Sequence, residues 1–423
     1  MQTLFTAAQL TDPRNAESER ILRKCVHCGF CTATCPTYVL LGDELDSPRG
    51  RIVLIKDMLE QGRAATPEVV RHVDRCLSCL ACVTTCPSGV DYRHLVEHAR
   101  SHIERTYRRP WLERRLRAFI ATTLPDPVRF RRALRWARWA RPLAPLLPRP
   151  LRALLAKAPR EAPRPASVAT GRGRAPATGK ARIALLSGCA QSVVAPAHHA
   201  ATLRVLEAAG AEVVTFGGCC GALTHHMGLE EHGRATATLL LDRLEAERAA
   251  RGLDAIVTSA SGCGLHVKDY GHVFASDPQR AAIAGRVGAL ARDAASMVAA
   301  LGLPTVSRPT GERVAYHPPC TLQHGLRTDA APRALLRAAG YDVVEVEESH
   351  LCCGSAGTYN LLQPALAEEL RERKLERLRR TGASIVATDN VGCAMQLDTP
   401  EGPRVVHTME LLDRALNGAP LEA

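Results

Sequence analysis

Apolar and polar positions divide the chain into an N-terminal part with helical periodicity and a C-terminal part in which short apolar runs alternate with longer helical patterns. In the N-terminal part, Ser47-Pro48 precedes apolar positions spaced three and four residues apart, and Thr66-Pro67 repeats this arrangement. A hydroxyl cap followed by proline in the first turn is typical of a helix start. We therefore expect two helices within residues 36–75.

The C-terminal part has the order of a parallel α/β fold. Six short apolar runs predict buried strands, and helical patterns such as residues 197–209 and 230–250 lie between them. Strands that alternate with helices form mainly parallel sheets. The expected fold class is therefore α+β overall, with a helical N-terminal domain followed by a duplicated α/β domain. The predicted strands are Ala181–Ser187, Glu212–Phe216, Ala255–Ser259, Arg313–Tyr316, Tyr341–Val346 and Ser384–Thr388.

The cysteines indicate that the α/β part is an internal duplication. Each half has one cysteine after its first strand, a Cys-Cys-Gly triplet after its second and a Gly-Cys pair after its third. Because open α/β sheets bind ligands at the carboxyl ends of their strands, we expect each half to gather four thiols at that edge. These are Cys189, Cys219, Cys220 and Cys263 in the first half, and Cys320, Cys352, Cys353 and Cys393 in the second.

Length and composition limit the class of protein. With 423 residues, of which 46% are hydrophobic and 23% charged, the chain is typical of a globular protein of several domains. It has no apolar run of about 18 residues and no signal-peptide pattern, so its sixteen cysteines are expected to be thiolate ligands in a reducing cytosol. The expected domains are residues 1–105, a basic segment with a linker at 106–180, and the two halves at 181–310 and 311–423.

The strongest chemical signal is a cysteine motif that occurs twice in the N-terminal part, with the spacing C-x2-C-x2-C-x3-C-P. In two-cluster ferredoxins the first three thiolates hold one 4Fe–4S cluster, and the cysteine before proline ligates the other. A pair of zinc sites is the alternative, but it leaves the third cysteine and the Cys-Pro pair unexplained. The expected ligand sets are Cys25, Cys28, Cys31 with Cys86, and Cys76, Cys79, Cys82 with Cys35.

The eight cysteines of the duplicated part allow two interpretations. Adjacent cysteines can hold two irons of one cluster. Alternatively, the thiols bind no metal and are buried in the apolar sheet, as free cysteines often are. Four thiols per half, repeated, favour a metal or acceptor site. His317 and His350 stand close to these cysteines in the sequence and are candidate extra ligands or hydrogen-bond donors. Residues 354–357 are rich in glycine but lack the spacing of a dinucleotide fingerprint.

Charge is concentrated in one segment. Residues 100–182 hold 22 Lys or Arg and four acidic residues, which gives this segment a charge of +18. Because the net charge of the whole chain is +12, the remaining residues together carry −6. A basic amphipathic helix with aromatic residues suits an anionic membrane surface or a partner's groove, and a connector packed on its own domains is the alternative. No nucleic-acid reading module accompanies the arginines, so we expect no nucleic-acid partner. Trp111, Leu112, Leu116, Phe119 and Ile120 are predicted to share a helical face opposite Arg114, Arg115 and Arg117, and the remaining tryptophans are Trp136 and Trp139.

These motifs resemble a known family. The chain resembles the iron–sulfur subunits of bacterial glycolate oxidases, also called glycolate dehydrogenases, over nearly its whole length. More distantly, the duplicated cysteine-rich part, with its CCG triplets, is similar to heterodisulfide reductase subunits and to the iron–sulfur subunits of lactate and anaerobic glycerol-3-phosphate dehydrogenases. The stretches that carry the resemblance are residues 25–36 (CVHCGFCTATCP), 42–52 (GDELDSPRGRI), 187–191 (SGCAQ), 321–324 (TLQH) and 349–359 (SHLCCGSAGTY).

The resemblance implies a division of labour. FAD-binding partner subunits would oxidise glycolate to glyoxylate, and this chain would pass the electrons through two 4Fe–4S clusters to a quinone-type acceptor. It would have no flavin and no catalytic residue of its own, and would be cytoplasmic, with a peripheral contact at the inner membrane. The same relay for lactate or another 2-hydroxy acid is an alternative, because the substrate pocket would lie on a partner.

One departure from the heterodisulfide reductase pattern bears on a third function, a reductase that acts at the CCG cysteines. In those relatives the last cysteine of a half belongs to Cys-x-x-Cys, which provides a fifth thiolate. Ala260 and Asn390 occupy the equivalent positions here. A five-thiolate cluster cannot form in either half, which disfavours the reductase, whereas a four-thiolate cluster and no cluster both stay open.

Overall fold

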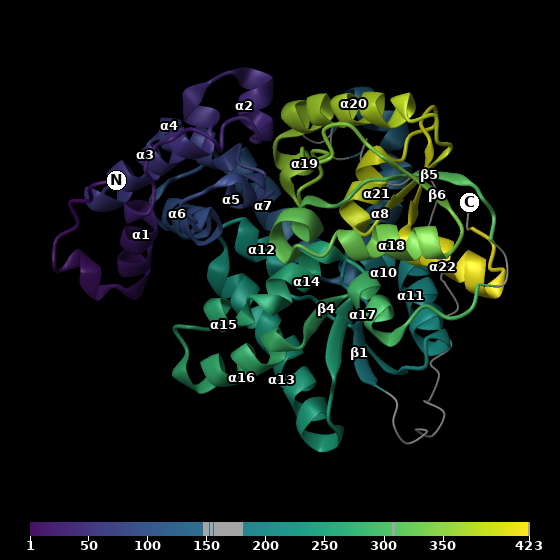
Figure 1. The fold of residues 1–423 in the computed structure, drawn as a ribbon. Helices are drawn as coiled ribbons and strands as arrows, with labels where there is room; N and C mark the ends of the chain where they lie inside the picture. Colours follow the sequence, from purple (N-terminus) through teal and green to yellow (C-terminus); the bar gives the residue numbers. More distant parts are fainter. Residues whose placement is uncertain (147–151, 153–154, 156–180, 307–308, 422–423) are drawn as a thin grey trace.

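A helical N-terminal part lies against two parallel sheets (Figure 1). The computed structural model describes residues 1–146, 152, 155, 181–306 and 309–421. In Figure 1 the purple and blue N-terminal helices lie beside both the teal first repeat and the green-to-yellow second repeat. Within the expected basic segment and linker at 106–180, most of the Pro-, Arg- and Ala-rich linker part, residues 141–180, lies outside the described residues.

The N-terminal helices start where the caps predict them. The Ser47 hydroxyl accepts a hydrogen bond from the Gly50 amide (2.9 Å), and the Thr66 hydroxyl accepts one from the Val69 amide (3.3 Å). The two expected helices are thus confirmed as α3 and α4. The N-terminal elements are η1 (Gln9–Thr11), α1 (Pro13–Arg23), α2 (Pro36–Leu41), η2 (Glu44–Asp46), α3 (Pro48–Glu60), α4 (Pro67–Asp74), α5 (Ala81–Thr85) and α6 (Tyr92–Thr106).

The basic segment continues as α7 (Trp111–Thr123), α8 (Pro127–Ala140) and the 3-10 turn η3 (Arg141–Leu146). The predicted arrangement of charges on α7 is wrong for Arg117, which is buried and donates a hydrogen bond to the Met227 carbonyl oxygen (2.7 Å). Trp111, expected on the packed face, is 70% exposed. The reason is that α7 packs through Ile120 and Ala121, so the contact is set by its C-terminal half.

Each repeat contains a four-stranded parallel sheet of the same topology. The strand orders are β2-β1-β3-β4 and β6-β5-β7-β8, which confirms the duplication. The first repeat contains β1 (Arg182–Leu186), α10 (Gln191–Val194), α11 (Pro196–Ala208), β2 (Glu212–Phe216), α12 (Ala222–His226), α13 (Glu230–Arg251), β3 (Ala255–Thr258), α14 (Ser261–Lys268), α15 (Tyr270–Val273), α16 (Pro278–Ala289), β4 (Ala291–Asp293) and α17 (Ala294–Leu301).

The second repeat follows the same plan, with fewer helices after its third strand. Its elements are β5 (Arg313–Tyr316), the π-helical turn η4 (Thr321–Leu326), α18 (Ala330–Ala338), β6 (Asp342–Glu345), α19 (Tyr359–Leu362), α20 (Pro364–Arg380), β7 (Ile385–Thr388), α21 (Val391–Leu397), β8 (Arg404–His407) and α22 (Thr408–Asn417). The six predicted strands are present to within a residue at either end. Strands β4 and β8 were not predicted, because they are short and contain at most two adjacent apolar residues.

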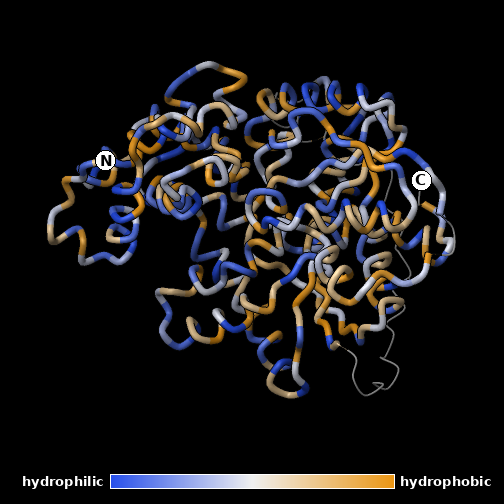
Figure 2. The backbone as a smooth tube through the Cα atoms, viewed as in Figure 1, coloured by the Kyte–Doolittle hydropathy of each residue, from blue (hydrophilic) through white to orange (hydrophobic). Residues whose placement is uncertain are grey.

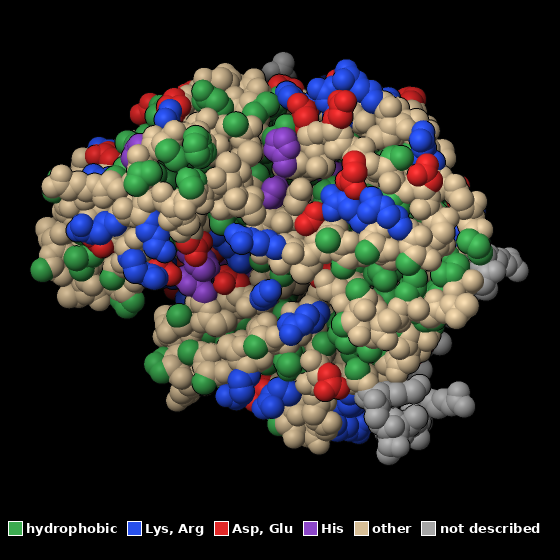
Figure 3. All heavy atoms as spheres, viewed as in Figure 1, with side chains coloured by type: hydrophobic (Ala, Val, Ile, Leu, Met, Phe, Trp, Pro, Cys, Tyr) green, Lys and Arg blue, Asp and Glu red, His purple; other side chains and the backbone are tan. Residues whose placement is uncertain are grey.

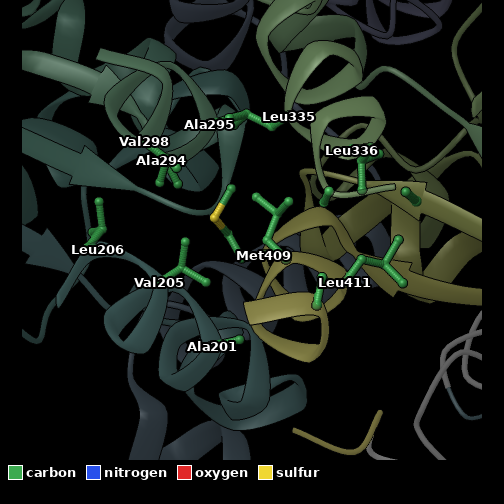
Figure 4. Packing of buried hydrophobic residues seen from close by; sticks show 14 of the residues in the cluster. Ala201, Val205, Leu206, Ala294, Ala295, Val298, Leu335, Leu336, Met409 and Leu411 are labelled. Carbon is green, nitrogen blue, oxygen red and sulfur yellow. The ribbon is translucent and has the colours of Figure 1, made fainter. Parts of the chain in front are cut away.

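The two repeats share one hydrophobic core. Helices α11 and α17 of the first repeat pack against α18 and α22 of the second, and Figure 4 shows their side chains pointing toward one another, with Met409 in the middle. Met409, Val298 and Leu336 are fully buried. Figure 2 shows the apolar strands inside and mixed polar and apolar positions along α20 at the surface. This core holds the carboxyl edges of the two sheets in a fixed relation.

Candidate metal centres

The first cysteine motif wraps around a small cavity. Cys25, Cys28 and Cys31 line it together with Cys86, which lies 55 residues further along the chain than Cys31, and with Cys82. The cavity volume is about 30 Å³. The second and fourth residues after the first cysteine have left-handed backbone conformations in both motifs: His27 and Gly29 in one, Ser78 and Leu80 in the other. Three of these four are not glycine, so the fold imposes the same strained wrap twice.

The second motif lies beside the remaining cysteine of the first. Burial raises the pKa of the Cys82 thiol, and so do the neighbouring thiols of Cys79, Cys76 and Cys35. Burial also acts on Cys76, but the charges of Arg51 and Arg100 outweigh it and lower the pKa of that thiol. Thiolates are the form that binds metal, so a buried site with fixed cations suits an anionic iron–sulfur group.

Arg51 is central to this environment although its side chain is only 1% exposed. It donates hydrogen bonds to the His72 carbonyl oxygen (2.6 Å) and the Thr37 hydroxyl (2.9 Å), and one Nη lies 3.8 Å from the Cys35 sulfur. Arg51 lies in one of the stretches that carry the family resemblance, but its role was not predicted from the sequence. The sequence offers no signal for it, because a single arginine on an amphipathic helix is normally exposed.

In the first repeat, all four thiols meet at the carboxyl edge of the sheet, as expected. Cys219 is hydrogen-bonded to Cys189 and Cys220, and these bonds lower the pKa of the Cys219 thiol to about 4. Cys220 also contacts Cys263. The site therefore favours one thiolate among its four sulfurs.

The second repeat adds a histidine to its four thiols. The sulfurs of Cys320 and Cys352 are 4.0 Å apart. Hydrogen bonds from Cys352 and Cys393, and then one from His317, lower the pKa of the Cys353 thiol. The ligand atoms of His317, Cys353 and Cys393 all lie within 4.8 Å of one another, which is close enough to hold a metal ion. Of the two histidines singled out in the sequence, His317 belongs to this buried group, whereas His350 is half-buried and its carbonyl oxygen accepts a hydrogen bond from His324 (3.1 Å).

Steric constraints explain why the third residue of each Cys-Cys-Gly triplet is glycine. Gly221 and Gly354 have φ angles of +89° and +88°, and a Cβ atom at either position would collide with a helix behind it. The obstructing atoms are the carbonyl oxygens of Gly233 and Ala367. Only glycine allows the paired thiols to turn back toward the sheet at this distance. Asn390, at the position where the heterodisulfide reductase pattern has a further cysteine, places its Nδ2 3.5 Å from the Cys393 sulfur.

The second motif also contacts the second repeat. Cys79 and Leu77 pack in one apolar cluster with Cys352 and Cys320, and the Cys320 thiol adds to burial in raising the pKa of Cys79. The contact is reinforced by Thr84, whose hydroxyl lies 2.8 Å from Nδ1 of His324. The sulfur-rich parts of two domains are therefore in direct contact.

A large cavity of about 1270 Å³ opens beside these groups. Its lining includes Cys76 and thiols of both repeats, and its wall is largely apolar, with α7 and α8 contributing Phe119, Phe130 and Trp136. The cavity exceeds the roughly 300–1,000 Å³ of ordinary small-molecule sites. It places the amphipathic helices and the thiols around one space.

Comparisons with known proteins agree with this arrangement. Residues 21–90 match the 4Fe-4S dicluster domain, and residues 183–268 and 314–398 each match the cysteine-rich domain named CCG. The glycolate oxidase iron-sulfur subunit of Escherichia coli (strain K12) is 40% identical over 418 residues, which cover 98% of this chain and 99% of that protein. This chain belongs to the family of glycolate oxidase iron–sulfur subunits.

The chain is also similar to further proteins, some of them outside this family. The probable glycolate oxidase iron-sulfur subunit of Bacillus subtilis (strain 168) is 31% identical over 440 residues, covering 97% of this chain and 98% of that protein. Lactate utilization protein A of Oceanobacillus iheyensis is 25% identical over 246 residues, which cover 56% of this chain and 98% of that protein. The resemblance read from the motifs is confirmed, as are the fold class and the iron–sulfur, oxidoreductase character of the chain.

Two structural findings concern the surface of the chain. Among the described residues, no helix combines the length and apolar character needed to cross a membrane. Three tryptophans are strongly exposed, with Trp111 and Trp136 at 70% and Trp139 at 82%. Helix α8 has no fully buried residue: Phe130 is half-buried in the cavity wall, and both tryptophans of the helix are exposed.

Proposed function

We propose that this chain is the electron-transfer subunit of a complex in which FAD-binding partner subunits oxidise glycolate to glyoxylate. It would hold two 4Fe–4S clusters and deliver electrons to a quinone-type acceptor. When bound, such clusters carry one electron at a time. The proposed domain limits are those given above: 1–105, 106–180, 181–310 and 311–423.

The proposed ligand sets are supported by which thiols the fold brings together. Cys86 shares a cavity with the first three cysteines of the other motif, and Cys35 acts electrostatically on the thiols of Cys79 and Cys82. Crossed ligation explains both contacts, because the cysteine before proline turns away from its own motif. We propose Cys25, Cys28, Cys31 and Cys86 for one cluster, and Cys76, Cys79, Cys82 and Cys35 for the other.

The main support for electron transfer is that cysteine sulfurs follow one another without a break from the first ferredoxin-type motif to the large cavity. The two proposed ligand sets adjoin each other, and Cys79 of the second adjoins Cys320 of the second repeat. Cys320 and Cys352 line the large cavity. Electrons that enter at the first set therefore have a short path to an acceptor in the cavity.

The cavity and its helical wall support a lipophilic acceptor. Its volume can hold a quinone ring together with part of an isoprenoid chain, and its wall is mainly apolar. Trp136 lines this cavity and is also strongly exposed, so the wall reaches the surface. We propose that α7 and α8 contact the cytoplasmic face of the inner membrane, where arginines meet anionic lipid headgroups and tryptophans meet the acyl boundary.

The proposal is tested with the purified complex prepared with and without this chain. Glycolate-driven reduction of a water-soluble quinone analogue should require the chain, whereas reduction of an artificial dye at the flavin should not. Cys79→Ser in the complete complex should abolish the first reaction and leave the second. Quinone reduction at the wild-type rate without the chain would contradict the proposed role.

The amounts of iron and acid-labile sulfide per chain show whether the CCG cysteines also bind clusters. About eight of each, measured after anaerobic purification, would mean that only the two ferredoxin-type sets bind clusters. About twelve or sixteen would place further clusters at Cys189–Cys263 or Cys320–Cys393. Zinc in place of iron would contradict the electron-transfer proposal.

A second candidate substrate is lactate, favoured by the match to lactate utilization protein A. The relay would be the same, because the substrate would bind to the partner. Oxidation of glycolate and of lactate by the same purified complex separates the two. A kcat/KM for lactate above that for glycolate would assign the chain to lactate oxidation.

A further inference from the structure

His226 lies where the proposed electron path opens into the cavity. It ends α12, which begins immediately after the Cys-Cys-Gly triplet of the first repeat, and it lines the large cavity together with Cys219 and Cys220. Its side chain is 33% exposed. A group that can carry a proton and sulfurs that can carry electrons thus face the same space.

A buried carboxylate faces the inner edge of this imidazole at ion-pair distance. Glu97 of α6 has a side chain that is 6% exposed, and its Oε1 lies 3.2 Å from Nδ1 of His226. The Nδ1 atom itself is buried, so the exposed third of the ring is the opposite edge, which carries Nε2. Burial disfavours the charged form of Glu97, but the charges of Arg93 and then His225 hold the pKa of this carboxyl well below its usual range. Burial lowers the pKa of His226, and the Glu97 carboxylate opposes that lowering. An ionised carboxylate beside Nδ1 therefore favours the protonated form of a ring that would otherwise release its proton readily.

One arginine joins this histidine to the second cysteine motif. Arg100, also on α6, donates hydrogen bonds to the carbonyl oxygens of His226 (3.1 Å) and Cys76 (2.5 Å) and to the Ser78 hydroxyl (2.8 Å). The same helix therefore carries the residue that holds the imidazole ring and the residue that holds its backbone. The spacing between His226 and the proposed second cluster is fixed by these bonds.

Polar groups extend from Glu97 to the surface. The ligand atoms of His94, Glu97 and Asp269 lie within 4.8 Å of one another, and His94 stacks on the half-buried His272. Figure 3 shows histidine side chains flanked by acidic and basic ones in the recess where the N-terminal helices meet the first repeat. The charged and titratable groups around Glu97 and His226 are Glu17 on α1, Arg93, His94 and Arg100 on α6, His225 on α12, His266 on α14, Asp269, and His272 on α15.

Ion pairs in this network hold α6 against the first repeat, but they do not account for the buried His266. His266 is buried beside His225 and His226, with ring centroids 5.1 and 5.8 Å away, and neither of its ring nitrogens has a hydrogen-bond partner among the described residues. Burying imidazoles with unused hydrogen-bonding capacity is costly. A cluster of this kind next to a cavity is typical of a functional site.

We infer that His226, positioned by Glu97, donates protons to an acceptor bound in the large cavity, an inference that rests on the proposed reduction of a quinone by this chain. Conversion of a quinone to its quinol takes two electrons and two protons. The electrons come from the oxidation of glycolate on the partner subunits, and O–H bonds form at the two carbonyl oxygens. Each proton given up by Nε2 of His226 is replaced from solvent through the polar groups that lead to the surface.

The test compares two readouts in the complete complex. Bleaching of the visible absorbance of the clusters by glycolate reports electron arrival and requires no proton donor, whereas quinone reduction requires both. His226→Gln should slow reduction of a water-soluble quinone analogue by about 100-fold, the scale of general acid catalysis, and leave cluster bleaching and iron content unchanged. His98→Gln is the matched control, because His98 is a buried neighbour of Glu97 on α6 that bonds Ser18 (2.7 Å) and does not line the cavity.

Glu97→Gln separates positioning from a purely structural role. The quinone-reduction rate should fall as the pH rises, because His226 loses the proton that it donates. Without the Glu97 carboxylate the imidazolium is less stable, so in this variant the fall should occur at lower pH than in the wild type. An unchanged pH profile and rate in this variant, or unchanged quinone reduction in His226→Gln, would overturn the inference while leaving the proposed function intact. Parallel loss of quinone reduction and cluster bleaching would also overturn it, because His226 would then act on electron transfer or folding. A wild-type complex that bleaches its clusters but reduces no quinone would instead reject the proposed acceptor, and the inference with it.

Discussion

Arg51 forms a salt bridge with Asp46 at a place where neither side chain reaches solvent. Their N–O distance is 3.2 Å, and the side chains are 1% and 0% exposed. The other carboxylate oxygen of Asp46 lies 2.7 Å from Arg75, and Arg51 in turn faces the Cys35 sulfur. The charge balance of the proposed cluster environment therefore depends on one buried carboxylate.

Removing that carboxylate should be costly. We expect Asp46→Asn to reduce the free energy of unfolding by about 3–5 kcal/mol, because it leaves a buried guanidinium uncompensated. Asp57→Asn, which breaks an exposed pair with Arg63, should cost less than about 1 kcal/mol. Denaturant unfolding of the two variants under anaerobic conditions makes the comparison, and equal losses would contradict the importance given to the buried pair.

Crossed ligation makes a prediction about pairs of variants. Cys86→Ser and Cys28→Ser should lose the same EPR signal, and Cys35→Ser and Cys79→Ser should lose the other, with iron falling from about eight to about four per chain in each case. If Cys86→Ser instead removes the signal that Cys79→Ser removes, each motif ligates its own cluster. Retention of about eight irons in any of the four variants would exclude that cysteine as a ligand.

The steric role of the Cys-Cys-Gly glycine is measurable by stability. Gly221→Ala should destabilise the chain more than Gly210→Ala, a position in the same repeat that also has a positive φ but has open space around a Cβ. The control should cost about 1–2 kcal/mol from backbone strain alone. The difference between the two unfolding free energies reports the collision with Gly233, and no difference would mean that α13 moves away freely.

Membrane contact through α8 should depend on its tryptophans. Trp136→Ser combined with Trp139→Ser should reduce co-sedimentation with vesicles that contain anionic lipid, because exposed tryptophans supply the apolar part of interfacial binding. Leu239→Ser on α13 alters an equally exposed apolar residue elsewhere and should leave binding unchanged. Binding that persists in the double variant would leave the helix as a connector or a protein-binding surface.

The stability of the contact between α6 and the first repeat should depend on pH through His94. Burial opposes protonation of this ring, but hydrogen bonds to Asp269 and Asp91 outweigh it and raise the pKa of His94 to about 10. The stabilisation is therefore complete below the unfolded value near 6.5 and is lost as the pH rises through about 10. The gap in thermal midpoint between wild type and His94→Gln should be widest at pH 6 and close above pH 10, whereas the exposed His232 should show no such gap when replaced by glutamine.

Much of this architecture follows from local sequence. Caps such as Ser47-Pro48 start helices through contacts three residues away. Inner strands such as Ala255–Thr258 appear as apolar runs because both faces of their sheet are covered. The cysteine spacing likewise predicts the two motifs and the duplication, since ligands of one group must stand at short, fixed intervals. The edge strand Arg404–His407 escaped prediction because its only apolar residues are two adjacent valines, too short a run to mark a strand.

Tertiary structure alone decided which distant groups meet. Glu97 and His226 are 129 residues apart, and no local pattern marks the carboxylate that faces the imidazole. Arg51 and Arg117 have the composition of surface residues and are buried only because thiols, carboxylates and carbonyl oxygens from other elements surround them. Local spacing determines which side chains can ligate together, because it acts through a few bonds. The partner of a buried charge depends on the packing of whole helices, which the sequence specifies only through the complete fold.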